Sequence, residues 1–160
     1  MKRKDREVTG FEEMLKVVDA SDVCRIGLSD ERVPYIIPLN FGYEVVDGQL
    51  ILYFHGVSKG KKQDLIKRNN GEASFEMDTG HTLIEGEAPC DYTYLYQSVI
   101  GSGHLELLEE YEDKLHGLEQ IMNHYGRSDG TPYGIKMKNE IVEMTCVMCL
   151  RVCSWTCKRH

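Results

Sequence analysis

Basic residues are scarce in this chain relative to acidic ones. The 160 residues include 19 lysines and arginines against 26 aspartates and glutamates, and the formal net charge is −7 at pH 7. A protein that binds nucleic acid usually presents a basic face to the phosphate backbone. This balance therefore argues against nucleic acid as a partner.

Long hydrophobic runs are missing as well. The longest apolar stretches, such as residues 49–54, are far shorter than the roughly 20 residues of a membrane-spanning helix. No apolar segment follows the basic residues 1–7, so we expect no secretory signal. We therefore expect a cytoplasmic protein without a membrane partner. With 41% hydrophobic residues the chain can form a core, and its length suits a single domain over residues 1–160.

Cysteine is the residue type in excess. Four of the six cysteines, Cys146, Cys149, Cys153 and Cys157, lie close together near the C-terminus. Their spacing fits neither the ferredoxin pattern nor paired zinc knuckles. In a strand, positions 146 and 149 point to opposite faces and cannot chelate one metal without distortion. We predict no metal site and interpret these cysteines as buried apolar residues, with a thiol-based metal or redox sensor as the alternative.

Hydrophobic spacing predicts a mainly β chain with interspersed helices. Helices are predicted over residues 11–20, 59–70 and 107–125, with Thr9 and Ser58 as the N-caps of the first two. Strands are predicted over residues 24–28, 33–46, 49–54, 73–78, 92–108 and 140–152, with a break at 101–103 and a loop at 127–134. Short hairpins of this kind favour an antiparallel barrel or split sheet with helices outside, an α+β fold.

Two prolines lie inside the predicted strand over residues 33–46. Because proline cannot donate a hydrogen bond to a neighbouring strand, this strand should lie at a sheet edge or be bulged near Pro34 and Pro38. Its backbone at residues 38–40 is then free to meet a ligand. The Asp47–Gly48 pair that follows predicts a hairpin to the next strand.

The start of the second predicted helix is suited to an anion. Ser58-Lys-Gly-Lys-Lys62 combines ammonium groups with the free amides and positive dipole of a helix N-terminus, and His55 ends the strand before it. Taken alone, the lysines are more often a solvated pair and the histidine a surface residue.

Four short motifs together resemble a known family. Pro-Tyr-Ile-Ile-Pro-Leu-Asn-Phe at residues 34–41, Tyr-Phe-His-Gly at 53–56, Gly-Lys-Lys at 60–62 and Tyr-Gln-Ser-Val-Ile-Gly at 96–101 stand in the order found in the flavin split-barrel superfamily. This is the pyridoxamine 5'-phosphate oxidase-like group, and within it the chain is most similar to the 5-nitroimidazole-resistance (Nim) proteins.

The resemblance implies a homodimer of antiparallel split β-barrels with FMN at the interface. It implies a functional role for His55 near the flavin and a phosphate site at Lys61 and Lys62. The cofactor-binding residues that it implies are Ile37, Pro38, Leu39, Asn40, His55, Gly56, Lys61, Lys62, Tyr96, Ser98, Val99 and Trp155. For Trp155 a plain core or interface role is the alternative.

The function that follows is reduction of a small nitroaromatic or related substrate by an FMN-dependent oxidoreductase. Two alternatives stay open. One is a flavin- or haem-binding protein without turnover, because a fold alone does not fix the chemistry. The other is the thiol-based sensor described above.

Overall fold

Strands dominate the computed structural model, which describes residues 4–126 and 137–160. The strands are β1 (Glu7–Val8), β2 (Cys24–Leu28), β3 (Tyr35–Leu39), β4 (Phe41–Val46), β5 (Gln49–Gly56), β6 (Glu72–Ile84), β7 (Thr93–Leu108) and β8 (Cys146–Arg159). The helices are α1 (Phe11–Asp19), α2 (Lys61–Arg68), α3 (Tyr111–His124) and α4 (Asn139–Met144), with 3-10 turns η1 (Lys4–Arg6) and η2 (Pro89–Asp91). All strand pairings of the described residues are antiparallel, as expected.

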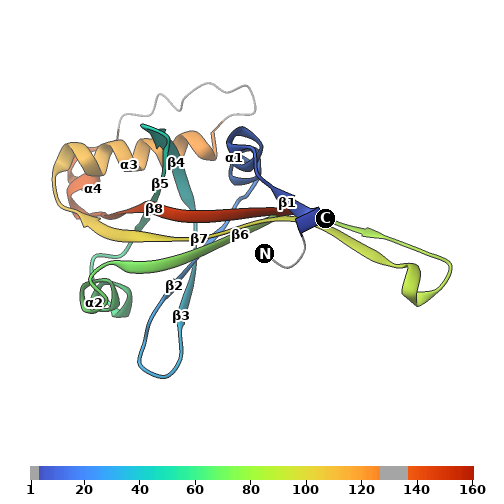
Figure 1. The fold of residues 1–160 in the computed structure, drawn as a ribbon. Helices are drawn as coiled ribbons and strands as arrows, with labels where there is room; N and C mark the ends of the chain where they lie inside the picture. The colour runs from blue at the N-terminus through green and yellow to red at the C-terminus, as the bar shows by residue number, and fades with distance from the viewer. Residues whose placement is uncertain (1–3, 127–136) are drawn as a thin grey trace.

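The sheet curls back on itself (Figure 1). Its strand order is β3-β2-β6-β7-β8-β5-β4, with β1 beside β8. β3 and β4 stand at opposite ends of this order, although Asn40 alone separates them in the chain. The two end strands therefore approach each other at Asn40 without pairing, which leaves the barrel split there. β3 is an edge strand, as Pro38 predicted.

Strand β5 is buried on both faces, which explains its continuous apolar sequence. Leu50, Leu52 and Phe54 point into the main core, together with α1 and the inner faces of β2, β6 and β8. Ile51 and Tyr53 point to the other side, where α3 covers the sheet. Helix α3 packs closely because Gly42 on β4 has no side chain: a Cβ there would lie 2.2 Å from the carbonyl carbon of Gln120. None of the helices in the described ranges is long and apolar enough to cross a membrane.

The prediction of one strand over residues 33–46 was wrong in one respect. It is two strands, because β3 pairs with β2 and β4 pairs with β5, and the chain changes partner at Asn40. The Asp47–Gly48 hairpin is confirmed, with both residues at positive φ as a tight turn between twisted strands requires. Gly101–Gly103 does not break β7, which continues through a shift in its register with β8 after Ser102.

Three other predictions need correction. Residues 140–144 are helical, not extended, because Val142 packs as one buried turn against Leu118 and Val147. Residues 107 and 108 belong to β7, and α3 begins after them. The N-caps of α1 and α2 are Gly10 and Gly60, which provide no side-chain cap, so Thr9 and Ser58 do not have that role. The loop predicted over residues 127–134 lies outside the described residues.

Candidate functional site

The first group of predicted site residues gathers where β3 ends and β5 ends. Phe41 pairs with Phe54 in the β4–β5 ladder, so the preceding Asn40 comes beside His55, the next residue of β5. Asn40 and His55 are both exposed. Ile37 and Leu39 pack partly against the core, whereas Pro38 between them is exposed on the outer face of the edge strand. The open seam of the barrel therefore presents β3 backbone next to His55.

Lys62 lies over the end of β5. Its Nζ is 2.5 Å from the point where a Cβ on Gly56 would stand, so the absence of a side chain at Gly56 makes room for the ammonium group. The side chain is half-buried, and burial lowers the pKa of Lys62, with the nearby Cys146 thiol acting in the opposite direction. No acidic side chain of the described residues forms an ion pair with Lys62. A half-buried cation without a partner is suited to an anionic ligand.

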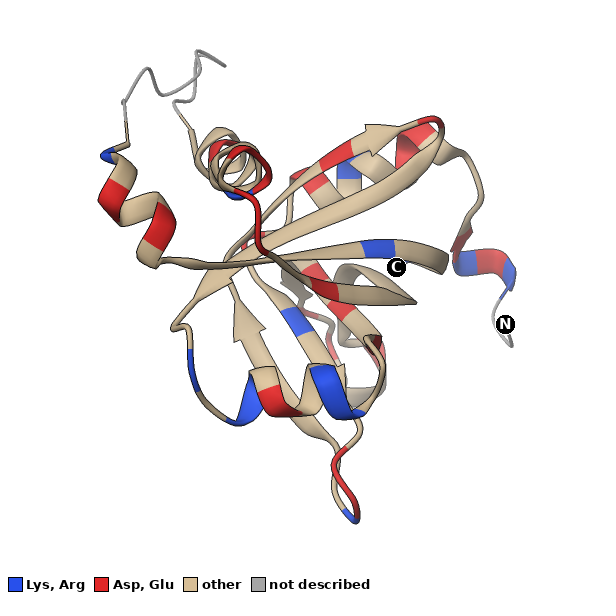
Figure 2. Ribbon diagram, turned by 90° about the vertical axis from the view of Figure 1, so that its left-hand side faces the viewer, with Lys and Arg blue, Asp and Glu red and all other residues tan. Residues whose placement is uncertain are grey.

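Lys61 is placed differently. Its Nζ is 2.7 Å from an oxygen of Asp30 and 4.9 Å from the centre of the Tyr35 ring. Asp30 also accepts a hydrogen bond from the guanidinium of Arg68 at 2.7 Å. The hydrogen bonds from both cations lower the pKa of Asp30. Lys61 therefore ties α2 to the β2–β3 connection. Figure 2 shows the basic positions along α2, which hold Lys61 and Lys62 at its first turn.

Gln63 is a residue of this corner that the sequence did not single out. It is 5% exposed, and its Nε2 donates to the carbonyl of Val57 and, at 3.7 Å, to the sulfur of Cys146. Its Oε1 is buried beside Gly60 and has no hydrogen-bond partner among the described residues. A buried unpaired acceptor costs free energy, so this oxygen is suited to a donor from a ligand. The only sequence signal was its place on the buried side of a short amphipathic helix.

The start of α2 adds backbone donors to the corner. Gly60 has φ 139°, a conformation that favours glycine, and its carbonyl accepts from the amides of Gln63 and Asp64. The amides of Lys61 and Lys62 have no carbonyl one turn earlier to bond. The corner thus offers an ammonium group, two helix-start amides and a buried acceptor. This set fits a phosphate that is attached to a chain bearing hydroxyl groups.

The second group of predicted residues lies at the far end of β7 and β8. Ser98 pairs with Lys158, and Tyr96 accepts the amide of the terminal His160 through its carbonyl. Trp155 is partly buried and packs edge-on against Phe11 at 5.7 Å. Val99 is fully buried in the main core, so its side chain does not line a surface site.

Within one chain, the predicted site residues near His55 lie far from those near Ser98. His55 pairs with Val147 on β8, whereas Ser98 pairs with Lys158, 11 residues further along the same strand. At about 3.3 Å per residue, the two groups are separated by roughly 36 Å along β8. A single small ligand bound to one chain cannot contact both groups.

The four C-terminal cysteines are distributed over different surroundings. Cys149 faces α3 and is buried, which raises its pKa to about 11, whereas Cys146 lies on the other side of β8 near Lys62. Cys157 is buried and Cys153 is exposed. In the described residues no three His, Cys, Asp or Glu side chains are grouped to hold a metal ion. Cys146 and Cys149 therefore lie on opposite faces of β8, as the sequence predicted. The interpretation of these cysteines as buried residues is wrong for Cys153, which is exposed where the register of β8 with β7 shifts.

A groove of about 610 Å³ crosses the outer face of β2, β6, β7 and β8. Among its lining residues are Gly27, Pro34, Ser74, Ser102, Gly103 and Cys153. None of the predicted cofactor residues lines it. Glu72 and His104 also line it, but no lysine or arginine of the described residues does. An anionic cofactor is better matched by the cation at Lys62, so we place the candidate site at that corner.

The sequence and the structure of this chain are both similar to those of known proteins. A family model described as pyridoxamine 5'-phosphate oxidase matches residues 11–159. A candidate 5-nitroimidazole antibiotic resistance protein from Bacteroides thetaiotaomicron is similar in structure, with a TM-score of 0.80 and 28% identity over 96% of this chain and 86% of that one. No protein with a curated description matches significantly.

Two more distant structures share the fold. The flavocytochrome Anf3 from Azotobacter vinelandii aligns with a TM-score of 0.77 and 18% identity, over 100% of this chain and 72% of that one. A FAD-binding protein from Mesorhizobium loti aligns with a TM-score of 0.65 and 19% identity, over 97% of both chains. The antiparallel sheet with its open seam is therefore the split-barrel fold of these proteins.

Proposed function

Since the chain belongs to the pyridoxamine 5'-phosphate oxidase family, we propose that it is an FMN-binding oxidoreductase that acts as a homodimer on a small nitroaromatic or related substrate. The observation that carries the proposal is the corner at Lys62, where a half-buried cation without an acidic partner in the described residues lies over Gly56.

In this proposal Lys62 and the first amides of α2 bind the phosphate of FMN. Lys61 has a supporting role, because its ammonium group is already paired with Asp30. The unpaired Oε1 of Gln63 accepts a hydrogen bond from a hydroxyl of the ribityl chain. Residues Ile37–Asn40 would hold the ring, because this edge strand leaves backbone groups free of a neighbouring strand in the described residues.

When bound, a flavin supplies the electron-transfer chemistry, and the protein supplies position and proton donors. His55 is exposed at the seam beside Asn40. An imidazole there could donate a proton to an oxygen of a substrate bound at the seam. We therefore assign His55 as the proton donor in substrate reduction.

The separation of the two groups of site residues supports a homodimer. Tyr96 and Ser98 lie on β7 beside the C-terminal end of β8, too far from Lys62 of the same chain to contact a cofactor held there. In a two-fold dimer, the β7 end of one chain can approach the seam of its partner. Each site then combines residues from both chains.

The identity of the cofactor can be tested with the purified protein. We expect flavin absorption, and mass analysis of the material released on denaturation should identify FMN. Release of FAD would correct the cofactor while keeping the flavin chemistry. A colourless protein that takes up neither flavin would refute the proposal.

Turnover is tested with bound flavin that has been reduced chemically under anaerobic conditions. Addition of a nitroaromatic should reoxidise it, and His55→Ala should slow this step by about 10²-fold, the lower end for loss of a general acid. His104→Ala, which removes another exposed histidine, is the matched control and should react at the parental rate. Equal rates for His55→Ala and the parent would remove His55 from the mechanism.

A further inference from the structure

The β6–β7 hairpin extends beyond the rest of the molecule as an arm of residues 80–95 (Figure 1). Within the arm, Thr82, Leu83 and Ile84 pair with Leu95, Tyr94 and Thr93. The turn η2 lies near its tip. In the described residues no third strand pairs with this part of the hairpin. A two-stranded ribbon of this kind is marginally stable in water by itself.

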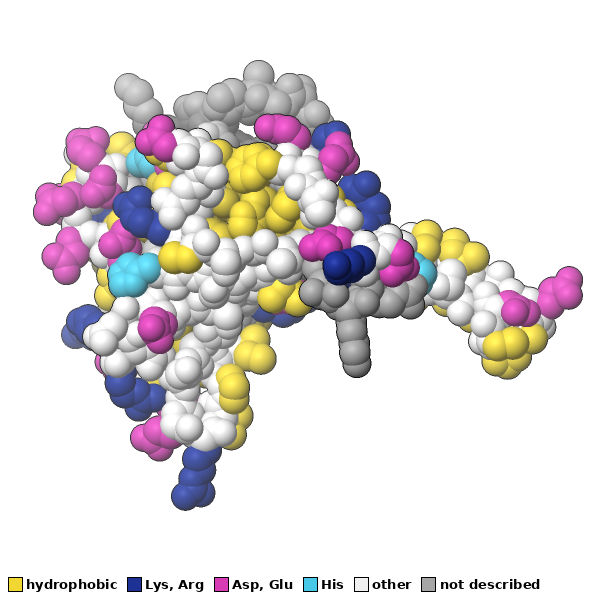
Figure 3. All heavy atoms as spheres, in the orientation of Figure 1, with side chains coloured by type: hydrophobic (Ala, Val, Ile, Leu, Met, Phe, Trp, Pro, Cys, Tyr) yellow, Lys and Arg dark blue, Asp and Glu magenta, His cyan; other side chains and the backbone are white. Residues whose placement is uncertain are grey.

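Large apolar side chains cover the arm. Leu83 is 51% exposed and Tyr94 is 52% exposed, and because they pair directly across the ladder they form one apolar face. Ile84 and Tyr92 are also exposed. Figure 3 shows these apolar side chains on the projecting arm, with acidic side chains toward its tip. Exposed apolar groups concentrated on one projecting element mark a surface that another chain covers.

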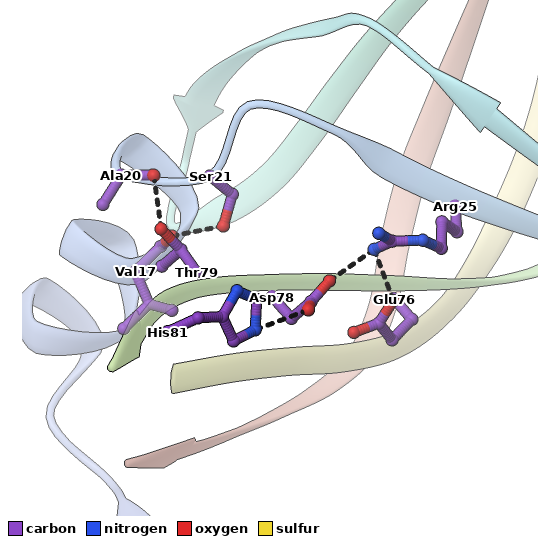
Figure 4. A network of polar contacts seen from close by, with 8 residues as sticks. All are labelled: Val17, Ala20, Ser21, Arg25, Glu76, Asp78, Thr79 and His81. Atoms are coloured by element: carbon purple, nitrogen blue, oxygen red, sulfur yellow. Dashed lines mark hydrogen bonds and ion pairs between the residues drawn. The ribbon is translucent and has the colours of Figure 1, made fainter. Parts of the chain in front are cut away.

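The arm has a firmly held base. Arg25 on β2 binds Asp78, and also Glu76 at 3.1 Å, and His81 lies 2.7 Å from Asp78 (Figure 4). The Thr79 hydroxyl donates to the carbonyl of Ala20 at 2.8 Å. These contacts join the base of the arm to β2 and α1. The direction of the arm is therefore set by the body, which reduces the entropy lost when a partner binds.

The charge of the arm complements another part of the same chain. Residues 80–95 contain Glu85, Glu87 and Asp91 and no lysine or arginine. At the α2 region, Lys59 and Lys67 are exposed and form no ion pair with the described residues. An acidic arm and a basic helix region on one chain can meet twice in a two-fold dimer, because each chain provides both surfaces.

We propose that the arm of one chain lies against the α2 region of a second copy, burying Leu83 and Tyr94 and placing Glu85 and Glu87 near Lys59 and Lys67 of that copy. The inference rests on the homodimer of the proposed function and names the segment that holds it. Lys62 lies at the start of the same helix, so the arm of one chain would also approach the phosphate corner of the other. Each flavin site is then incomplete without the second chain.

Crosslinking tests this contact directly, because Cys90 is exposed on the arm. A short thiol-to-amine reagent is applied to a mixture of unlabelled and ¹⁵N-labelled full-length protein after subunit exchange. Mass spectrometry should find Cys90 linked to Lys59 or Lys67 in pairs that combine one light and one heavy peptide. Cys90→Ser should remove these links, and the other exposed cysteine, Cys153, provides the background. Links confined to peptides of the same isotope, or links to Lys114 on α3 in their place, would overturn the inference.

Charge reversal gives a second measurement that does not depend on the reagent. Glu85→Lys/Glu87→Lys should weaken dimerisation by about tenfold in sedimentation, and adding Lys59→Glu/Lys67→Glu should restore it. Reversal of Glu109 and Glu112 on the body should leave the dimer unchanged. A parental chain that binds flavin as a monomer would overturn the inference and leave the cofactor proposal standing. A dimer without flavin would refute the cofactor proposal, and the crosslinks would still decide the role of the arm.

Discussion

Replacing Gly56 by alanine should weaken FMN binding while leaving the fold intact. The new Cβ would lie 2.5 Å from Nζ of Lys62, whereas an ordinary contact is about 3.5 Å or more. The ammonium group must therefore move by about 1 Å. The movement is cheap for the apo protein, because Nζ is the end of a flexible chain, and Gly56 is not among the residues at positive φ.

The displaced ammonium group lowers the affinity for FMN, because it can no longer donate its hydrogen bond to the phosphate. A hydrogen bond from a charged donor contributes about 1.5–3 kcal/mol, so its loss should raise the Kd for FMN by roughly 10- to 150-fold. Riboflavin has the same ring and ribityl chain without the phosphate, and its Kd should change little. The measured quantity is the ratio of the two constants, obtained by titrating apoprotein and following flavin fluorescence.

Two further variants serve as a positive and a negative control for the loss of FMN affinity. Lys62→Ala should reproduce the selective loss of FMN affinity, and Lys16→Ala, which removes an exposed lysine on α1, should not. Thermal unfolding should show Gly56→Ala within about 1 kcal/mol of the parent. If Gly56→Ala and Lys62→Ala leave the preference for FMN over riboflavin unchanged, Lys62 does not bind the phosphate and the reasoning from this corner is wrong.

Three further outcomes follow from the same structure. Because burial lowers the pKa of Lys62 and a bound phosphate favours its charged form, the FMN affinity should fall as pH rises through that lowered pKa, while Lys62→Arg should remove this fall in calorimetric titrations at stepped pH. Gly42→Ala should destabilise the fold by about 1–3 kcal/mol in urea unfolding, because its Cβ would meet the backbone of α3 at Gln120. A thiol reagent should label Cys90 and Cys153 in the native protein, whereas Cys149, buried with its pKa raised to about 11, should react after unfolding.

Local sequence patterns predicted the strands well where one face or both faces are buried against fixed neighbours. The β4–β5 hairpin was predictable because Asp47–Gly48 determines both the turn and the register. The division at Asn40 was not predictable in this way. The alternation of side chains continues from β3 into β4, and the exchange of partner depends on strands elsewhere in the chain. Residues 140–144 illustrate a second limit, because a short apolar run has no period that separates one helical turn from a strand.

The phosphate corner shows the same limit at the level of single residues. The sequence placed Lys61 and Lys62 together at a helix start, and nothing local distinguishes two adjacent lysines. What separates them is Asp30, which is 31 positions before Lys61 in the chain and reaches it through the β2–β3 connection. Because Asp30 pairs with Lys61, Lys62 is the lysine of the two that lacks an acidic partner in the described residues, and Gly56 gives it space on β5. The proposed preference of this corner for a phosphate thus depends on two features: Asp30 pairs with Lys61, and the missing side chain of Gly56 leaves space for Lys62.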